Sequence, residues 1–309
     1  MPGSLALAID LGGTKVEAAL VDLDGHLVDG SRFREPTGRD SSSAQLAERV
    51  RAVVDGARSS APRHDRIIGV GIGSAGPIRQ EAGLVSPLNL PAWRDFPLRG
   101  LLEECVSGLA TTLRIDGLCI TLAEHWVGAA QGVGNVMGMV VSTGIGGGLI
   151  LGGHTVSGPT GNAGHIGHVE VSGFDDPCAC GGHGCLEAIA SGPRSVAWAR
   201  EQGWSGTSGE ELAESYAAGD TVAVAAIARA GRAIGLAIGS ATALVDLDLV
   251  AIGGGFSRAT PELFDHIRRG IDEHSRFEFT RKVRVVPSQL SDTGPLVGAA
   301  ALVHRADLL

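Results

Sequence analysis

The most constraining feature of this sequence is a pattern that occurs twice: an apolar run, a glycine-rich turn and a second apolar run. A short apolar run bounded by turn residues predicts a buried β-strand, so each occurrence predicts a strand–turn–strand unit. This repetition predicts an internal duplication and a chain of two related lobes. The two units comprise residues 5–9, 10–14 and 16–21 in the first half, and residues 136–142, 143–148 and 149–151 in the second.

The segments that follow the first turn limit the fold further. A dinucleotide-binding fold sends its glycine loop into a helix, whereas here the turn leads into another strand. Asp24-Gly25 is a hairpin signal and predicts a third strand around residues 26–29. The rest of the chain predicts an α/β protein. Expected strands lie at 67–72, 111–115, 247–252 and 283–286, and expected helices at 43–58, 117–131, 260–274 and 294–303, with mostly helix from 187 to 243.

Length and composition exclude several classes of protein. The 309 residues suit two lobes, and a hydrophobic content of 44% argues against disorder. A net charge of −9 without any Lys/Arg-rich tract disfavours a general nucleic-acid binder, which needs a basic face. No apolar run approaches the ~20 residues of a membrane span, and the first residues lack a secretory signal pattern. We therefore predict a cytoplasmic protein.

Three glycine-rich turns are candidates for binding a nucleotide. In the first, residues 10–14, two glycines let backbone N–H groups face an anion, and Asp10 can hold Mg²⁺ or its water shell. The second, residues 143–148, offers another phosphate-binding turn, and the third, residues 253–255, suits a base or ribose lying against backbone without side chains. Each turn alone also fits an ordinary hairpin or bend, but the three together predict a nucleotide site. Its predicted ligands are Asp10, Gly12, Gly13, Thr14, Lys15, Thr143, Gly144, Gly146, Gly147, Gly253, Gly254 and Gly255.

A short Cys/His cluster is a predicted metal site. Three thiolates and one imidazole satisfy a tetrahedral Zn²⁺ with no open position, so we expect a structural zinc. Three free core thiols are the alternative, but a glycine-rich polar loop is a poor core. His165 and His183 compete as ligands, although a solvated or substrate-facing role suits them better. The predicted ligands are His168, Cys178, Cys180 and Cys185.

Together these segments resemble the ROK family of sugar kinases and repressors. The resemblance covers essentially the whole chain and includes the two glycine turns, Gly164-His165-Ile166-Gly167-His168 and the run Cys-Ala-Cys-Gly-Gly-His-Gly-Cys-Leu-Glu at 178–187. ROK repressors carry an N-terminal helix-turn-helix, whereas this chain begins with its first strand, so it is similar to the kinase branch. The resemblance implies an actin-like, ribonuclease H-like ATPase fold in which sugar and ATP meet between two lobes. We expect a small lobe of residues 1–115 plus about 296–309, and a large lobe of 116–295 with the zinc loop.

The resemblance also implies a catalytic base. The family has an Asn-Asp pair where this chain reads Ile115-Asp116, and Glu124 follows eight residues after the Asp as in the family. Asp116 therefore matches the base, and a carboxylate at a strand end can take the proton from a sugar hydroxyl that attacks the γ-phosphorus. A helix N-cap is the alternative role for Asp116. Ile115 replaces an amide that binds sugar in the family, which leaves the sugar and the rate open.

Further sugar contacts follow from the same resemblance. His165 stands where many glucokinase-like members have Glu, and residues 158–168 and 86–90 are similar to bacterial N-acetylmannosamine kinases. Glu187 matches a family sugar ligand; the alternative is an acid favoured by a helix start. For the contacts in the first lobe, the alternative is plain turn chemistry. The predicted substrate-binding residues are Ser74, Ala75, Gly76, Asn89, Asp116, His165, His168 and Glu187.

The function predicted from the sequence is transfer of the γ-phosphoryl group of MgATP to O6 of a hexose or N-acylhexosamine. Glucose and N-acetylmannosamine are the first candidates, with Asp116 as general base. We also expect a homodimer or a dimer of dimers, which is common among kinases of this type. One alternative is a sugar-binding ROK protein with little or no turnover, which Ile115 motivates. The other is a DNA-binding repressor, which the acidic charge disfavours.

Overall fold

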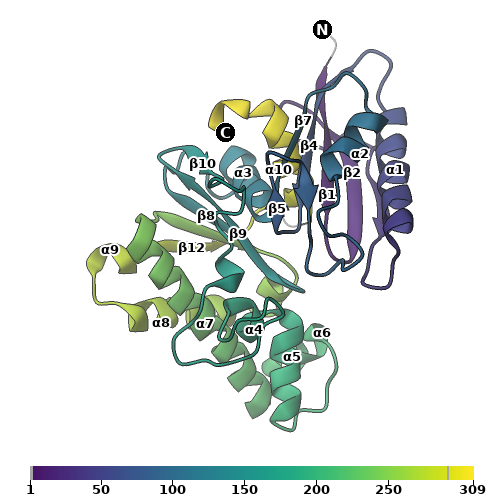
Figure 1. Cartoon of the computed structure of the whole chain (residues 1–309). Helices are drawn as coiled ribbons and strands as arrows, with labels where there is room; N and C mark the ends of the chain where they lie inside the picture. Colours follow the sequence, from purple (N-terminus) through teal and green to yellow (C-terminus); the bar gives the residue numbers. More distant parts are fainter. Residues whose placement is uncertain (1–2, 291) are drawn as a thin grey trace. The chain divides into compact units, whose positions relative to one another are not determined.

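The computed structural model describes residues 3–290 and 292–309 and shows a mixed α/β chain with two five-stranded sheets (Figure 1). The chain divides into two compact units. The first unit contains Met1–Gly132, Gly148–Gly164 and Asp292–Leu309, and the second contains Val133–Gly147 and His165–Ser291. The lobe bounds expected from the sequence differ from these units because they place residues 116–132 and 148–164 in the large lobe, and they stay a prediction.

The first sheet has the strand order β3-β2-β1-β4-β7, and two helical layers pack against it. Strand β1 pairs antiparallel with β2 and parallel with β4, which pairs parallel with β7. The bounds are β1 Ser4–Leu11, β2 Lys15–Val21, β3 Phe33–Pro36, β4 Arg66–Ser74, β7 Thr111–Ile115, α1 Ser43–Ser59, α2 Leu98–Cys105, α3 Asp116–Val127 and α10 Gly294–His304. The small sheet of β5 (Ile78–Arg79) and β6 (Leu84–Val85) belongs to the same unit.

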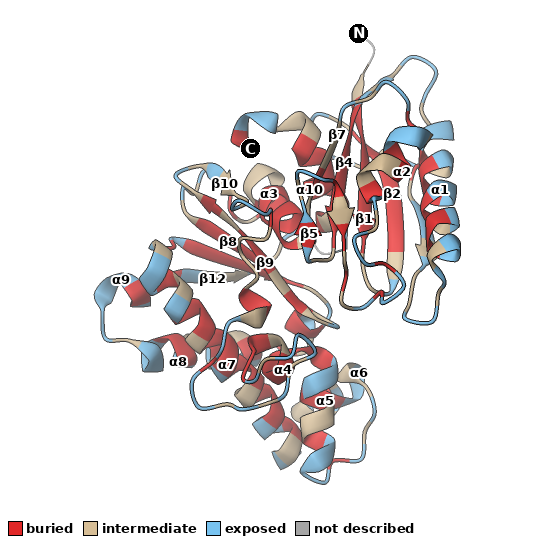
Figure 2. Ribbon diagram, viewed as in Figure 1, coloured by how far each residue is buried: buried red, intermediate tan, exposed pale blue. Residues whose placement is uncertain are grey.

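Alternation along β1 decides which helices cover each face of this sheet. Leu5, Leu7, Ile9 and Leu11 belong to the large apolar cluster shared with α1 and α2. The intervening alanines face the other way and pack, with Ala299 and its neighbours, in the cluster that includes α10. Figure 2 shows β1 and β2 as almost continuously buried. Because side chains alternate along a strand, Asp10 belongs to the face that carries the alanines.

The second sheet has the order β10-β9-β8-β11-β12, which repeats the first sheet's order of third, second, first, fourth and fifth strand. Strands β8, β11 and β12 are parallel, and β9 and β10 are antiparallel. This repeated order supports the predicted duplication. The bounds are β8 Val136–Val141, β9 Ile145–Leu151, β10 His154–Val156, β11 Leu249–Gly253, β12 Arg284–Pro287, α4 Leu186–Ala190, α5 Gly192–Glu201, α6 Gly209–Ala217, α7 Thr221–Val245, α8 Glu262–His274 and α9 Glu278–Arg281; 3-10 turns span Ile166–His168, Phe256–Arg258 and Ala306–Leu308.

Helix α7 is the one helix in the described residues that is long and apolar enough to cross a membrane, by length and composition alone. It has 25 residues, yet 61% of its apolar window is buried inside the protein. Its glycines let α8 approach closely: a Cβ on Gly235 would lie 2.2 Å from the carbonyl oxygen of Ile267. The apolar character of α7 is therefore that of a core helix.

Two expectations about the glycine turns are wrong. Residues 26–29 form one isolated antiparallel bridge, Leu27 to Val21, in place of a strand. The hairpin turn at Asp24-Gly25 does form, since Asp22 N–H donates to the His26 carbonyl at 3.0 Å, but a second turn at residues 29–30 ends the pairing. The third strand comes later, as β3, and pairs with β2. In the second half, β9 begins at Ile145, so Gly146 and Gly147 lie in a strand and not in the turn.

Close packing of α10 against α3 gives a first testable prediction. A Cβ on Gly298 would lie 1.7 Å from the carbonyl oxygen of Cys119, and a backbone atom cannot rotate away. Gly298→Ala is therefore expected to lower the free energy of unfolding by about 2–3 kcal/mol, although alanine is the better helix former by about 1 kcal/mol. Urea unfolding checks this, with Gly134→Ala, where nothing lies within 4 Å, as control. Equal stability of the two variants would contradict this packing.

Candidate active site and candidate metal centre

The first glycine turn brings a predicted sugar ligand to a predicted phosphate ligand. Gly12 N–H donates to the Lys15 carbonyl at 2.9 Å, which closes the turn between β1 and β2. A Cβ on Gly13 would lie 2.7 Å from Cβ of Asn89, so only glycine allows the loop of Asn89 to approach so closely. Thr14 is exposed at the tip of the turn. The turn thus presents bare backbone amides beside an amide side chain.

Asp10 and Asp116, the predicted metal and base residues, are neighbours in the first unit. Asp10 is 7% exposed and pairs in register with Gly73 of β4. A Cβ on Gly73 would lie 3.1 Å from Sγ of Cys119 in α3 and 3.7 Å from the Cα of Asp116, so the end of β4 packs against the first turn of that helix. Burial, with the negative charge of Asp116 as the next cause, raises the pKa of Asp10 from 3.8 to about 7. Two carboxylates this close are typical of a site that binds a cation or moves a proton.

Asp116 is not the N-cap residue of α3, so the alternative role considered for it does not apply. Ile115 is the N-cap residue, and Asp116 is the first residue of the helix, where its Oδ1 accepts from Gly117 N–H at 2.7 Å. Ile115 is 2% exposed and lies in the apolar cluster of the first sheet together with Leu118. The residue that replaces the family's amide is therefore a core residue here. Glu124 is fully buried and accepts from Ala129 N–H at 2.8 Å.

The remaining predicted residues of the first unit lie at the end of β4. Ser74 is the last residue of that strand and is fully buried, and its Oγ donates to the Ala75 carbonyl at 3.0 Å. Ala75 N–H donates to the Leu11 carbonyl at 2.9 Å, which ties this segment to the end of β1. The segment 74–76 therefore lies next to the first glycine turn.

Asp10 gives a prediction for metal-free protein. The native chain keeps the Asp10 proton up to about pH 7, whereas the ordinary carboxyl pKa is 3.8, so the native state binds more protons between these values. Stability without metal is therefore expected to fall as the pH rises through this window, by at most about 4 kcal/mol. Urea unfolding in chelator at pH 5 and pH 8 measures this fall, which should shrink in Asp10→Asn. An unchanged pH dependence in the variant would rule out this role.

A buried charge network beside Asp10 was missed from the sequence. Glu17, which faces Asp10 across β1 and β2, is fully buried and binds Lys15, Arg32 and Arg34. Burial raises the pKa of Glu17, but the hydrogen bonds from the three cations outweigh it and lower the pKa below its ordinary value. The sequence signal that could have revealed this network is a single Glu in an otherwise apolar strand, because a buried carboxylate needs cationic or hydrogen-bonding partners. Its role is to hold Lys15, a predicted phosphate ligand, next to the turn.

In the second unit, the second glycine turn, Glu187 and the segment 165–168 converge. Ile145 N–H donates to Glu187 Oε2 at 2.8 Å, so the carboxylate at the start of α4 is bound to the turn's backbone. A Cβ on Gly144 would lie 2.5 Å from the same oxygen, and one on Gly167 would lie 1.9 Å from the Ile145 carbonyl oxygen. The rings of His165 and His168 stack in this segment, with their centroids 6.1 Å apart.

The third glycine turn lies against the second. Gly254 has φ of 102°, and a Cβ there would lie 2.5 Å from the carbonyl oxygen of Val141, the last residue of β8. A Cβ on Gly255 would lie 3.6 Å from Ser142 Oγ. Gly253 ends β11, which pairs parallel with β8. The two turns of this unit thus share one edge of the second sheet, and Thr143 is exposed there.

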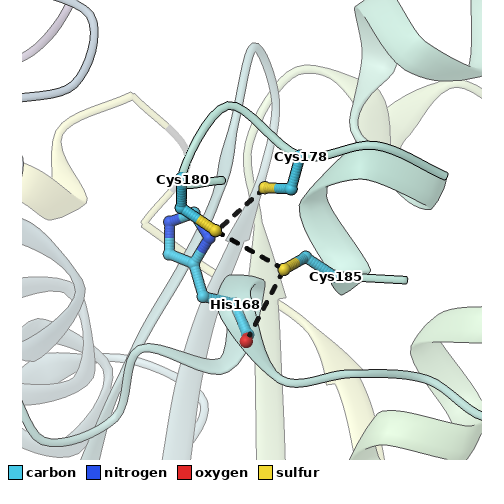
Figure 3. Close-up of side chains that lie close together, drawn as sticks. All are labelled: His168, Cys178, Cys180 and Cys185. Atoms are coloured by element: carbon cyan, nitrogen blue, oxygen red, sulfur yellow. Dashed lines mark hydrogen bonds between the residues drawn. The ribbon is translucent and has the colours of Figure 1, made fainter. Parts of the chain in front are cut away.

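The predicted metal ligands come together in Figure 3. The four donor atoms all lie within 4.8 Å of one another. Cys180 Sγ lies 3.7 Å from Cys185 Sγ, and Cys178 Sγ lies 3.6 Å from His168 Nδ1. Tetrahedral zinc with Zn–S of about 2.3 Å and Zn–N of about 2.05 Å requires separations of about 3.75 Å and 3.55 Å. The residues therefore fit a closed Cys₃His zinc site.

The loop that carries the cysteines is shaped by hydrogen bonds and leads directly into α4. Cys178 N–H donates to the Gly182 carbonyl at 2.8 Å, and Gly181 N–H to the Cys178 carbonyl at 3.0 Å. Cys185 is the N-cap residue of α4, two positions before Glu187. His183 lies outside the cluster and faces Asp175, with Nδ1 3.4 Å from Oδ1. A metal at this site would therefore fix the start of the helix that presents Glu187.

Comparisons with known proteins agree with this architecture. The family model described as ROK family matches residues 6–306. The glucokinase of Thermotoga maritima is 31% identical over 326 residues, covering 99% of each chain. The N-acetylmannosamine kinase of Escherichia fergusonii is 35% identical over 254 residues, covering 82% of this chain and 84% of that one. The structure of a ROK family glucokinase from Streptomyces griseus, in complex with glucose and AMPPNP, superposes with a TM-score of 0.83 at 29% identity, covering 97% of this chain and 99% of that one. The predicted actin-like α/β fold is confirmed.

Proposed function

This chain belongs to the ROK family, and we propose that it is a sugar kinase that transfers the γ-phosphoryl group of MgATP to O6 of a hexose or N-acylhexosamine. The observation that carries the proposal is the pair of neighbouring carboxylates, Asp10 and Asp116, beside a glycine turn whose Gly13 lies against Asn89. Similarity to a glucokinase and to an N-acetylmannosamine kinase, each across more than four fifths of the chain, supports the same reaction class.

Asp116 would act as the general base. The sugar O6 attacks the γ-phosphorus, the new O6–P bond forms as the bond to the β–γ bridging oxygen breaks, and the O6 proton passes to the Asp116 carboxylate. ADP leaves with the electron pair of the broken bond. Phosphoryl transfer needs positioning and charge neutralisation more than covalent help from the protein, so the base acts together with groups that bind the phosphates.

Asp10 would hold the magnesium that accompanies ATP. A carboxylate is a ligand that Mg²⁺ prefers, and when bound the ion neutralises charge on the phosphates. Lys15, held by Glu17, adds a fixed cation next to the same turn. In the second unit, Thr143 and Gly144 would bind phosphates, and Gly253–Gly255 the nucleoside.

Glu187 and His165 would orient the sugar, and Asn89 is a further proposed sugar ligand. Glu187 uses Oε2 for Ile145 N–H, which leaves Oε1 to accept a sugar hydroxyl. His165 can donate as well as accept, which suits an acetamido oxygen better than a second carboxylate would. The Cys₃His cluster would hold a structural zinc that fixes the Glu187 helix. Homodimerisation and a cytoplasmic location stay predictions.

A sugar panel with detection of released ADP tests the proposal. Glucose, mannose, N-acetylmannosamine, N-acetylglucosamine and fructose are offered with ATP, and separately with polyphosphate. The proposal expects saturable turnover of at least one sugar, a 6-phosphate as product, and no turnover of the matching 6-deoxy sugar. Saturable sugar binding without turnover on the whole panel would favour the alternative, a non-catalytic sugar-binding protein, for which the buried Ile115 is the motivating residue.

A further inference from the structure

One arginine of α7 ties together the two ends of the segment that carries the cysteines and Glu187. Arg229 Nη2 donates to both carboxylate oxygens of Asp176 at 2.7 Å, and its Nη1 donates to the Ile189 carbonyl at 3.0 Å. Asp176 precedes the three cysteines, and Ile189 follows Glu187 in α4. A single guanidinium thus closes the segment 176–189 from outside the metal cluster.

The surroundings of this guanidinium hold it in place. Its Cζ lies 5.1 Å from the ring centroid of Phe174 and 5.4 Å from that of Trp198 in α5. The Arg229 side chain is 16% exposed and that of Asp176 24%, so water screens the pair less than it screens a surface ion pair. A planar, forked cation that lies on aromatic rings can make these bonds together, whereas a lysine ammonium cannot.

The clamp reaches Glu187 along two routes. The Asp176 carbonyl accepts from Gly184 N–H at 2.9 Å, and Gly184 immediately precedes the N-cap residue of α4. At the other end, the bond to Ile189 holds the last turn of the same five-residue helix. A helix this short has little rigidity of its own, so its orientation depends on what holds its two ends.

We propose that Arg229 is a positioning residue for sugar binding, which sets the orientation of Glu187 through Asp176 and Ile189 and does so independently of the metal. The proposal rests on the proposed function in one respect, namely that Glu187 contacts the sugar. Its structural part, the closing of segment 176–189, needs neither sugar nor nucleotide.

Arg229→Lys and Asp176→Asn test the clamp, and Arg232→Lys is the matched control. Arg232 lies one turn along α7, with its Cζ 5.5 Å from the same Phe174 ring, but it pairs with Glu273 in a largely exposed ion pair. Hydrogen–deuterium exchange of residues 174–190, zinc content, and kcat and KM for the preferred sugar and for ATP are measured in each variant.

The clamp variants are expected to raise the sugar KM about tenfold, as loss of an outer supporting contact commonly does, with kcat and the ATP KM within about twofold. Exchange should rise in residues 174–190 and not elsewhere, zinc content should stay unchanged, and Arg232→Lys should match the wild type. Unchanged exchange and unchanged sugar KM would overturn the proposal, and so would exchange that rises throughout the chain while both KM values rise together. A wild-type protein that phosphorylates no sugar counts against the proposed function instead, because the exchange comparison still decides the clamp.

Discussion

Replacing Asp116 with asparagine is expected to lower kcat about 10³-fold, because general-base catalysis by a positioned side chain contributes roughly 10²–10⁴-fold. Asparagine keeps the size of the side chain and a carbonyl oxygen that can accept from Gly117 N–H, the bond that Oδ1 makes now. What it loses is the ability to take a proton. The sugar KM should therefore stay within about twofold, and the loss should appear in kcat and kcat/KM alike.

A matched variant separates the proton-accepting role of Asp116 from helix capping. Asp220 is the N-cap residue of α7, where its side chain accepts from the amides of Val222 and Ala223. Asp220→Asn should leave kcat near the wild-type value, with stability as its only altered property. Steady-state rates and thermal unfolding of both variants make the comparison. A fall in kcat of less than about fivefold in Asp116→Asn would remove Asp116 as the base.

Most strands of the two sheets were predictable because their signals are local, whereas β3 and β10 were not predicted. Thr111–Ile115 was predicted at its observed bounds, since five residues of suitable type lie between turn residues. In β1 the alternation of leucine or isoleucine with alanine even encodes which layer each face meets. The strand expected at 26–29 is reduced to a single bridge, Leu27 to Val21, because a second turn follows the hairpin that Asp24-Gly25 indicates. In that second turn Ser31 N–H donates to the Val28 carbonyl at 3.1 Å and Gly30 takes a φ of 73°.

In the candidate sites, too, features set by nearby residues were predictable and contacts between distant residues were not. The four residues of the candidate metal site could be named from the sequence because three of them lie within eight residues and their chemistry is specific. The bond from Arg32 to Asp292 joins residues 260 positions apart, and that from Arg229 to Asp176 joins residues 53 apart. No spacing rule relates such pairs, and an arginine on an apolar helix reads as a surface residue until the fold places its partner beside it.

The second large effect is expected at the metal loop. Purified protein should contain about one zinc per chain, and Cys185→Ser should lose most of it, together with about 10- to 100-fold in kcat/KM for the sugar. Cys185 is 4% exposed and is the N-cap residue of α4, so loss of its bond to the metal frees the start of the helix that carries Glu187. Cys180 is exposed at the rim of the cluster, and Cys180→Ser should also lose zinc.

Cys105→Ser controls for the loss of a thiol, because Cys105 lies at the end of α2 and outside the metal cluster. Mass spectrometry under native conditions gives the zinc content of each variant, and steady-state kinetics give kcat/KM. The loss of kcat/KM for the sugar should depend on how directly the replaced cysteine is attached to α4. We expect no loss for Cys105, an intermediate loss for Cys180 and the largest loss for Cys185. Native protein that carries no zinc and stays folded in chelator would show that the thiols hold the loop without a metal. Zinc loss with unchanged kcat/KM for the sugar would instead show that the metal does not govern Glu187, and that contacts such as the bond from Arg229 to the Ile189 carbonyl suffice to hold α4.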